Sequence, residues 1–328
     1  MKAFVLRRYG PPDLLELTDI DKPVPADDEV LVRVRATSIN PYDWHNMRGE
    51  PYIARLMPGV LGLRSPKLRI LGCDIAGQVE AVGKGVTQFR PGDEVFALLE
   101  QGGFAEYVAV RESLLGPKPE NLSHGQAATV PMAAITALLS LRDVGQLQPG
   151  QKVLVNGASG GVGTFAVQIA RALGAKVAGV CGPRSVDLVS SIGADEVLDY
   201  TTEDFTRGGQ RYDLVLDIAG SRSVAACRRV LSPRGTLVVV GGQPGRWLQP
   251  VGHMFSTLAM APLTSHRIVT ADTSRCTEKK QNLMTLTQLI EERKITPAID
   301  RCYPFEEIPA AIRYHEQGHT RGKVGVAV

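Results

Sequence analysis

The stretch VLVNGASGGVGTFAVQIARALGA, residues 153–175, limits the possible folds of this chain more than any other part of the sequence. Its first residues form an apolar run that is typical of a buried strand. Phe165 and Ile169 then recur on one face of a helix that we expect to begin at Thr164 and to stop at Gly174. Because a strand that leads through a glycine-rich turn into a helix is the first half of a βαβ unit, we predict a parallel sheet around it.

The sequence that follows this helix repeats the alternation of strand and helix. We predict further strands at 176–180, 196–200, 212–220 and 236–242. Strands that alternate with helices require a parallel sheet with helices on both faces, which is the doubly wound α/β arrangement.

The residues before this region follow a different pattern. Short β-type runs such as 29–37, 76–83 and 104–110 are separated by glycine and proline turns, which indicates a β-rich region. Near the C-terminus we expect an amphipathic helix at 279–295 and a returning strand in KVGVAV. We therefore divide the chain into three regions, 1–122, 123–265 and 266–328.

The glycine-rich turn predicts a binding site for a dinucleotide. Gly160 and Gly163 take the places of the second and third glycines of the dinucleotide fingerprint, and Ala158 takes the place of the first. The N–H groups at the start of the helix would face an anion such as a pyrophosphate, although a purely structural turn is the alternative. The residues predicted to bind the pyrophosphate are Ser159, Gly160, Gly161, Val162 and Gly163.

The end of the next strand favours NADPH over NADH. An NAD site usually has an acidic residue there that binds the ribose 2′-hydroxyl, whereas this chain has VCGPRS. Cys181 offers no carboxylate to repel a 2′-phosphate and is expected to be a small wall residue of the site. Arg184 is placed to bind that phosphate with its guanidinium, and a solvated surface arginine is the alternative.

Composition excludes several other classes of protein. Lys and Arg number 37 against 34 Asp and Glu, without any block of like charge, so we expect neither a nucleic-acid partner nor an anionic membrane surface. No apolar run is long enough to span a membrane, and the first residues lack a signal-peptide core, so the expected location is cytoplasmic. The five scattered cysteines form no CxxC pair, which argues against a disulfide framework and a structural zinc site.

Five segments stand in a characteristic order along the chain: GDEVF, GGFAEY, the NGASGGVGTFAVQIA turn, GADEVLDY and the tail GHTRGKVGVAV. Together they resemble the medium-chain dehydrogenase/reductase superfamily, in particular its zinc-free quinone oxidoreductase-like branch, over essentially the whole chain. The resemblance implies a GroES-like catalytic domain made from the N-terminal region and the C-terminal tail. It also implies a Rossmann domain inserted between them, an active site in the cleft, and a homodimer.

Zinc-dependent members of this superfamily hold a catalytic zinc with three protein ligands. By the resemblance, Asn40 stands where they have a cysteine and Cys73 where they have a histidine, and PMAAITA at 131–137 offers no third ligand. His45, Cys73 and Asp74 are expected to lie close together, but a cysteine beside an aspartate is more often a packing pair than a metal site. We expect no bound metal, which disfavours the alternative of a secondary alcohol dehydrogenase.

Without a Lewis acid, hydride is transferred more easily to a quinone or to the C=C bond of an α,β-unsaturated carbonyl, and the resemblance implies this chemistry. Asn40 is the candidate for holding the nicotinamide ribose or the substrate oxygen. Tyr42 and Tyr52 are the candidate proton donors, with a packing role or a water-derived proton as the alternatives. Asp43 is expected to be structural, bound to Arg48 or to a backbone donor. A non-catalytic NADPH-binding or adaptor protein is the alternative function.

The resemblance implies further contacts with NADPH. Tyr200 would join Arg184 around the 2′-phosphate, and Thr136, at the start of a helix, would contact the nicotinamide. The other predicted contacts lie at two strand ends and in the tail: Ala219, Gly220, Gly241, Gly242, Arg321 and Lys323. For the two tail residues, a solvated basic terminus is the alternative. The apolar segments 49–70 and 245–265 are expected to shape the pocket for a hydrophobic quinone or enone.

Overall fold

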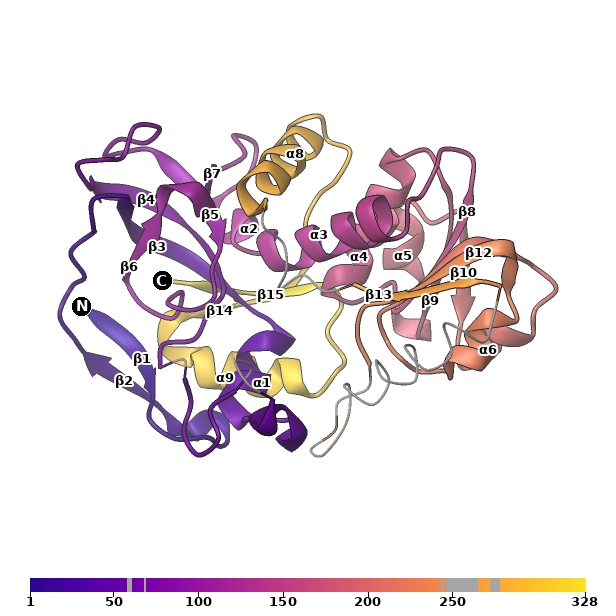
Figure 1. The fold of residues 1–328 in the computed structure, drawn as a ribbon, viewed down its shortest axis with the longest axis horizontal. Helices are drawn as coiled ribbons and strands as arrows, with labels where there is room; N and C mark the ends of the chain where they lie inside the picture. Colours follow the sequence, from indigo (N-terminus) through magenta and orange to yellow (C-terminus); the bar gives the residue numbers. More distant parts are fainter. Residues whose placement is uncertain (58–60, 68, 243–244, 246–264, 272–277) are drawn as a thin grey trace. The chain divides into compact units, whose positions relative to one another are not determined.

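A computed structural model divides the chain into two compact units (Figure 1). It describes residues 1–328 except 58–60, 68, 243–244, 246–264 and 272–277. The first unit comprises Met1–Met132, Glu278–Glu291 and Ile299–Val328, and the second comprises Ala133–Thr277 and Glu292–Ala298. The first unit thus combines the N-terminal region with the C-terminal tail, and both of its boundaries lie later in the chain than the divisions at 122 and 265.

The second unit is built on a parallel sheet of six strands in the order β10-β9-β8-β11-β12-β13. Its strands are β8 (Lys152–Asn156), β9 (Lys176–Cys181), β10 (Glu196–Asp199), β11 (Tyr212–Asp217), β12 (Leu231–Val239) and β13 (Arg267–Thr270). The chain moves outward from β8 in one direction and then returns to continue in the other, which is the strand order of a Rossmann fold. The prediction of a doubly wound α/β sheet is confirmed.

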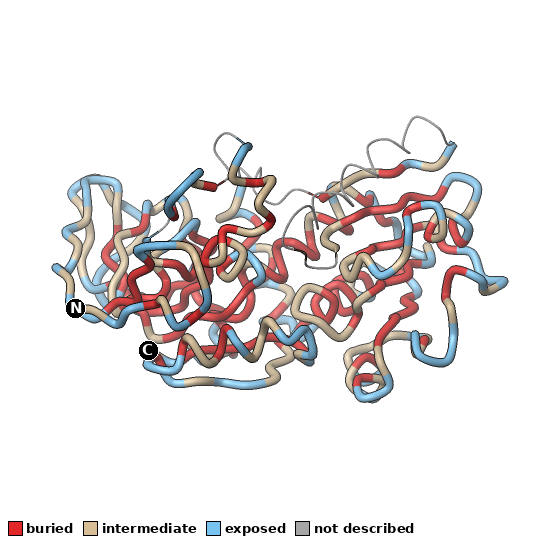
Figure 2. Tube along the Cα trace, turned by 90° about the horizontal axis from the view of Figure 1, so that it is seen from below, coloured by how far each residue is buried: buried red, intermediate tan, exposed pale blue. Residues whose placement is uncertain are grey.

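Helices α4 (Gly161–Ala172), α5 (Val186–Ser191) and α6 (Val224–Arg228) connect these strands. Phe165, Ala166 and Ile169 of α4 are fully buried, because they form the apolar stripe of that helix. The strands contribute residues such as Leu154 and Val215 to the core. Figure 2 shows the buried trace running along the strands, with exposed residues concentrated in the connections.

Helix α4 begins earlier than the predicted start at Thr164. Gly160 is extended, with φ −80° and ψ 177°, and its carbonyl accepts the N–H of Thr164 at 2.9 Å, so the helix starts at Gly161. Because glycine is unfavourable inside a helix, we assigned these glycines to the turn, and the predicted start of the helix was therefore too late.

The first unit contains a seven-stranded sheet in the order β14-β15-β3-β4-β5-β7, with β6 paired to β3, and a separate two-stranded sheet of β1 and β2. The strands are β1 (Lys2–Leu6), β2 (Leu15–Asp19), β3 (Glu29–Ile39), β4 (Asp74–Val82), β5 (Glu94–Leu98), β6 (Tyr107–Arg111), β7 (Leu115–Pro117), β14 (Ile299–Pro304) and β15 (Lys323–Ala327). β15, from the tail, pairs antiparallel with β3. The GroES-like, β-rich prediction for this part of the chain is confirmed.

The helices of the first unit pack beside this sheet. They are α1 (Pro41–Arg48), α2 (His124–Ala127), α8 (Lys279–Glu291) and α9 (Ile308–Glu316), while α3 (Pro131–Leu138) contains the residue at which the first unit ends. Helix α8 is shorter than the predicted 279–295, because Arg293 takes a left-handed conformation with φ +57°. The predicted acceptor-pocket segment 245–265 lies almost wholly outside the described residues.

We expect Gly163→Ala to destabilise the second unit. A Cβ at this position would lie 2.0 Å from the carbonyl oxygen of Gly157, so α4 would have to move away from the turn. This should cost about 1–3 kcal/mol in the free energy of unfolding, measured by urea denaturation. Gly160→Ala is the matched control, because its Cβ would lie 3.6 Å from the same oxygen. Equal unfolding midpoints for the two variants would contradict this prediction.

Candidate functional site

The glycine-rich turn lies where the strand order of the second unit reverses. β8 has β9 on one side and β11 on the other, and the turn follows directly from Asn156, the last residue of β8. In doubly wound sheets, ligands bind beyond the carboxyl ends of the strands at this reversal. The predicted pyrophosphate residues, 159–163, therefore occupy the place in the sheet that such folds use for a ligand.

The backbone of the turn fits a pyrophosphate. Gly157 has φ +94°, a conformation that L side chains rarely adopt, and a Cβ on Gly163 would strike the Gly157 oxygen. No side chain caps α4. Within the described part of the chain, the N–H groups of Gly161, Val162 and Gly163 donate to no protein group. These donors and the positive end of the helix dipole are available for an anion.

Two of the residues predicted around the 2′-phosphate, Cys181 and Tyr200, come together at two neighbouring strand ends, and Arg184 follows Cys181 by three residues. Cys181, at the end of β9, is paired with the last residue of β10, which precedes Tyr200. Tyr200 lies against Gly182, where a Cβ would come within 3.0 Å of the tyrosine hydroxyl. Tyr200 and Arg184 are both exposed, so each can reach a ligand. Cys181 is buried, and burial raises the pKa of its thiol to about 11, which suits a wall residue.

One carboxylate beside the end of β9, that of Asp199, cannot be recognised from the residues of β9 itself. Asp199 belongs to β10 and is brought opposite Cys181 by the pairing of the two strands. Its Oδ1 accepts the N–H of Thr201 at 2.9 Å and the hydroxyl of the same residue at 2.8 Å. The sequence signal for this carboxylate was the Asp of the LDY segment, directly before Tyr200.

A buried polar pair at the strand reversal was also missed. Asn156 and Asp217 end the adjacent strands β8 and β11, and the Asn156 amide donates to Asp217 Oδ1 at 2.7 Å and to Ser221 Oγ at 3.1 Å. Asp217 Oδ1 also accepts the N–H of Gly220 at 3.0 Å. The pair therefore holds the loop after β11 against the end of β8. The signal in the sequence was a polar residue closing each of two apolar strands.

The remaining predicted cofactor residues of this unit lie near the same edge or in α3. Ala219 and Gly220 follow β11, and Gly241 and Gly242 follow β12, so all four are near carboxyl ends of strands. Thr136 lies within α3 and not at its start, and it is 7% exposed. Contacts of these residues with a cofactor stay predictions.

A buried polar cluster lies in the first unit at the end of β3. Lys323, the first residue of β15, is 3% exposed; its ammonium donates to Asn40 Oδ1 and lies 3.3 Å from Asp74 Oδ2. The Asn40 amide donates to Asp74 Oδ2 at 2.9 Å and to Cys73 Sγ at 3.3 Å. A solvated terminus is therefore the wrong interpretation for Lys323, whereas Arg321 is exposed.

Asp43 is structural and is bound to backbone donors, as expected. Its Oδ2 accepts the N–H of Asn40 at 2.8 Å, and its Oδ1 accepts the N–H of Gly72 at 3.1 Å. Burial raises the pKa of Asp43 to about 7, and the charge of Asp74 acts in the same direction. Arg48 pairs instead with Glu316 of α9.

The two candidate proton donors differ in their surroundings. Tyr42, on α1, is 38% exposed. Partial burial, with added effects of Cys73 and Glu100, raises its pKa to about 12, so its hydroxyl keeps its proton at neutral pH. Tyr52 begins a 3-10 turn, and the Arg55 guanidinium lies 4.8 Å from the centre of its ring. The proton-donor role of either tyrosine stays a prediction.

The two residues at the zinc-ligand positions, Asn40 and Cys73, are in contact with each other. Asn40 is hydrogen-bonded to Cys73, and burial raises the pKa of the Cys73 thiol well above its usual value. His45 Nδ1 is 3.0 Å from the carbonyl oxygen of Glu50, so its ring is engaged with its own loop. Within the described ranges, no three His, Cys, Asp or Glu side chains are grouped so that they could hold a metal ion.

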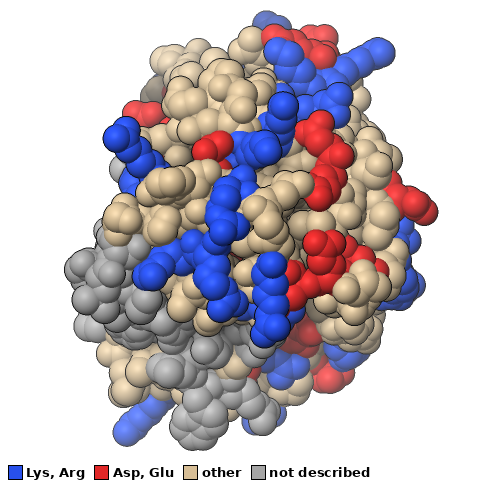
Figure 3. Space-filling view, turned by 90° about the vertical axis from the view of Figure 1, so that its right-hand side faces the viewer, with Lys and Arg blue, Asp and Glu red and all other residues tan. Residues whose placement is uncertain are grey.

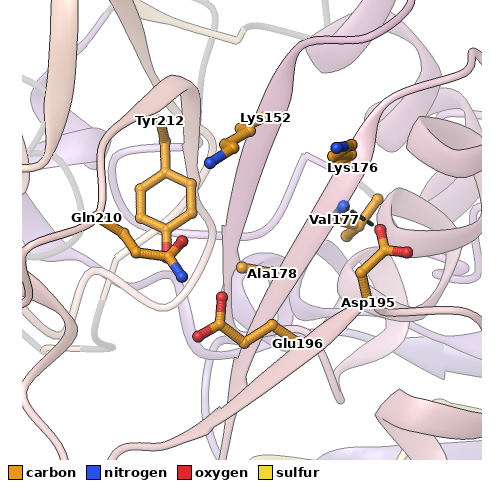
Figure 4. A pocket seen from close by; sticks show the side chains of 8 residues that line it. All are labelled: Lys152, Lys176, Val177, Ala178, Asp195, Glu196, Gln210 and Tyr212. Atoms are coloured by element: carbon orange, nitrogen blue, oxygen red, sulfur yellow. Dashed lines mark hydrogen bonds between the residues drawn. The ribbon is translucent and has the colours of Figure 1, made fainter.

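A hollow of about 420 Å³ opens at the opposite, amino-terminal edge of the parallel sheet (Figure 4). Its lining includes the first residues of four strands, Lys152, Lys176, Glu196 and Tyr212. Because the glycine-rich turn follows the carboxyl end of β8, this hollow is separate from the predicted dinucleotide site. The face in Figure 3 carries a band of Lys and Arg side chains with Asp and Glu beside it, so charges of both signs share that face.

Comparisons with known proteins agree with this architecture. A family model described as "Alcohol dehydrogenase GroES-like domain" matches residues 26–120, and one described as "Zinc-binding dehydrogenase" matches residues 192–326.

Among the helices that the structure describes, none has the length and apolar character needed to pass through a bilayer.

Similar proteins cover nearly the whole chain. The mitochondrial NAD(P)H oxidoreductase RTN4IP1 of Mus musculus is 33% identical over 100% of this chain and 89% of its own length. The 2-methylene-furan-3-one reductase of Solanum lycopersicum is 31% identical over 99% of this chain and 78% of its own length. The structure of Escherichia coli quinone oxidoreductase complexed with NADPH superposes with a TM-score of 0.84 at 25% identity, covering 100% of both chains. Together with the Rossmann and GroES-like sheets, these matches show that the chain belongs to the medium-chain dehydrogenase/reductase superfamily, in its quinone oxidoreductase-like branch.

Proposed function

We propose that the protein is an NADPH-dependent, zinc-independent oxidoreductase that transfers hydride to a quinone or to an α,β-unsaturated carbonyl compound. The observation that carries this proposal is the turn at the strand reversal, which needs glycine at 157 and 163 and leaves helix N–H groups available for an anion. The names of the relatives support it, since they include an NAD(P)H oxidoreductase and a furanone reductase, and the E. coli structure holds NADPH.

The second unit would hold the dinucleotide. Residues 159–163 would bind the pyrophosphate through backbone donors, and Arg184 and Tyr200 would bind the 2′-phosphate, with Cys181 as a wall. When bound, NADPH supplies the hydride from its nicotinamide ring. The Asn156–Asp217 pair would keep the loop at Gly220 in place beside the turn.

The first unit would serve the acceptor. Reduction of a quinone or enone adds a hydride and a proton, and negative charge develops on the conjugated oxygen as the hydride arrives. The hydroxyl of the partly exposed Tyr42 is protonated at neutral pH, and it would donate a hydrogen bond to that oxygen and then the proton. The cytoplasmic location and the homodimer stay predictions, and the mouse relative is named as mitochondrial.

The purified protein should oxidise NADPH over many turnovers when a quinone or an enone is added. The measurement is the loss of NADPH absorbance with a panel of both acceptor classes, with and without a zinc chelator. We expect turnover that the chelator does not change. Tight NADPH binding without turnover on the whole panel would favour the non-catalytic alternative.

Arg184→Ala should weaken NADPH binding by about ten- to hundredfold and leave NADH binding nearly unchanged, because the variant loses a charge-assisted contact with the 2′-phosphate alone. Fluorescence titration with each cofactor measures both dissociation constants. Arg211→Ala is the control, since Arg211 is exposed just before β11, at the opposite edge of the same sheet. Equal losses for the two cofactors would show that Arg184 does not bind the phosphate.

Tyr42→Phe should lower kcat by about a hundredfold with little change in KM, because the variant keeps the ring and loses the proton donor. Tyr52→Phe is the matched control and should retain kcat. Steady-state kinetics with one quinone and one enone would measure both. Unchanged kcat in Tyr42→Phe would identify water, or Tyr52 if its variant is slow, as the source of the proton.

A further inference from the structure

The Lys323 ammonium is held by protein groups alone. Besides Asn40 Oδ1 and Asp74 Oδ2, it lies 3.5 Å from the carbonyl oxygen of Ile39. A lysine ammonium has three N–H donors, and all three of these neighbours are acceptors. Lys323 is therefore built into the end of β3 by contacts with protein groups.

Asp74 needs this positive charge. It is 0% exposed, and a buried carboxylate is stable only when it is paired and hydrogen-bonded. Oδ2 accepts the Ser38 hydroxyl at 2.7 Å in addition to Asn40 and Lys323, and Oδ1 accepts the N–H of Met132 at 2.8 Å. The carboxylate is thus a fixed acceptor at the centre of the cluster.

The two charges leave the Asn40 side chain a single orientation. An ammonium can only donate and a carboxylate only accepts, so Oδ1 must face Lys323 and the NH₂ group must face Asp74. The backbone N–H of Asn40 is bound to Asp43. Asn40 directly precedes α1, so side-chain and backbone bonds together anchor the start of the helix that carries Tyr42.

We propose that Lys323 is a positioning residue that, through Asn40 and Asp74, fixes the start of α1 and with it the Tyr42 hydroxyl. This inference rests on the proposed function, in which Tyr42 supplies the proton. It replaces the expected contact of Lys323 with the cofactor and makes Asn40 a second positioning residue.

The test compares Lys323→Met, the double variant Lys323→Met/Asp74→Asn, and Lys118→Met. Lys118 is a second buried lysine of the same unit, whose ammonium donates to the carbonyl oxygens of Pro119 and Leu122 and lies 3.3 Å from Glu94. The readouts are kcat with a quinone, the dissociation constant for NADPH, the urea unfolding midpoint, and amide hydrogen exchange in α1.

Lys323→Met should lower kcat by about a hundredfold and speed exchange in α1, with NADPH binding unchanged, because a small displacement of a reacting group has effects of that size. The double variant removes the unpaired buried charge, so its unfolding midpoint should return toward that of the wild type. Its kcat should stay low and its α1 exchange fast, since Asn40 Oδ1 still lacks its donor. Lys118→Met should retain wild-type kcat and α1 exchange.

Three results would overturn the inference. Weaker NADPH binding with normal α1 exchange in Lys323→Met would indicate a contact with the cofactor. Recovery of kcat and α1 exchange in the double variant would show that Lys323 only neutralises Asp74. Unchanged α1 exchange in both variants would remove the positioning role. Wild-type protein that reduces no acceptor would refute the proposed function, whereas α1 exchange would still decide whether Lys323 anchors the helix.

Discussion

Gly163 of α4 lies against the carbonyl oxygen of Gly157 with no room for a side chain between them. This contact brings the first turn of α4 down onto the end of β8, where the strand order reverses. The buried stripe of Phe165, Ala166 and Ile169 then holds the helix against the sheet. Because the N-cap residue, Gly160, has no side chain that could cap the helix, the first N–H groups are left for a ligand. The same glycine-rich turn thus sets both the packing of α4 on the sheet and the geometry of the proposed anion site.

The glycine-rich turn of the second unit and the Lys323 cluster of the first unit differ in how their polar groups are partnered. The second unit leaves backbone donors of α4 unpaired in the described structure and places Arg184 and Tyr200 in exposed positions. The first unit buries Lys323 and Asp74 and supplies each with protein partners. Removing one member of such a buried pair typically costs about 3–5 kcal/mol. The first arrangement suits binding of an incoming anion, and the second suits holding a loop in one conformation.

Five of the six strands of the second unit could be predicted, because strands buried on both faces are nearly continuous apolar runs such as KVLVN and YDLVLD. β13 was not predicted, and β12 spans Leu231–Val239 where 236–242 was expected. The glycine positions of the turn were also readable, and two of them, Gly157 and Gly163, mark backbone constraints. What could not be predicted depends on strands that pair far apart in the sequence. Lys323 reaches Asn40 only because β15 lies beside β3, and Asp199 reaches Cys181 only because β10 lies beside β9. No local pattern encodes those pairings.

The charge balance around α1 supports proton donation to an acceptor oxygen. Burial raises the pKa values of Tyr42 and Cys73, so both stay protonated at neutral pH, and it moves the pKa of Asp43 to about 7. The Lys323–Asp74 pair has no net charge. An oxygen that gains negative charge beside Tyr42 during the proposed reduction would meet a protonated phenol, and its hydrogen bond would have to outweigh repulsion from Glu100 and from ionised Asp43. Under the proposed function, the acceptor develops its charge on a conjugated oxygen that a hydrogen bond can stabilise.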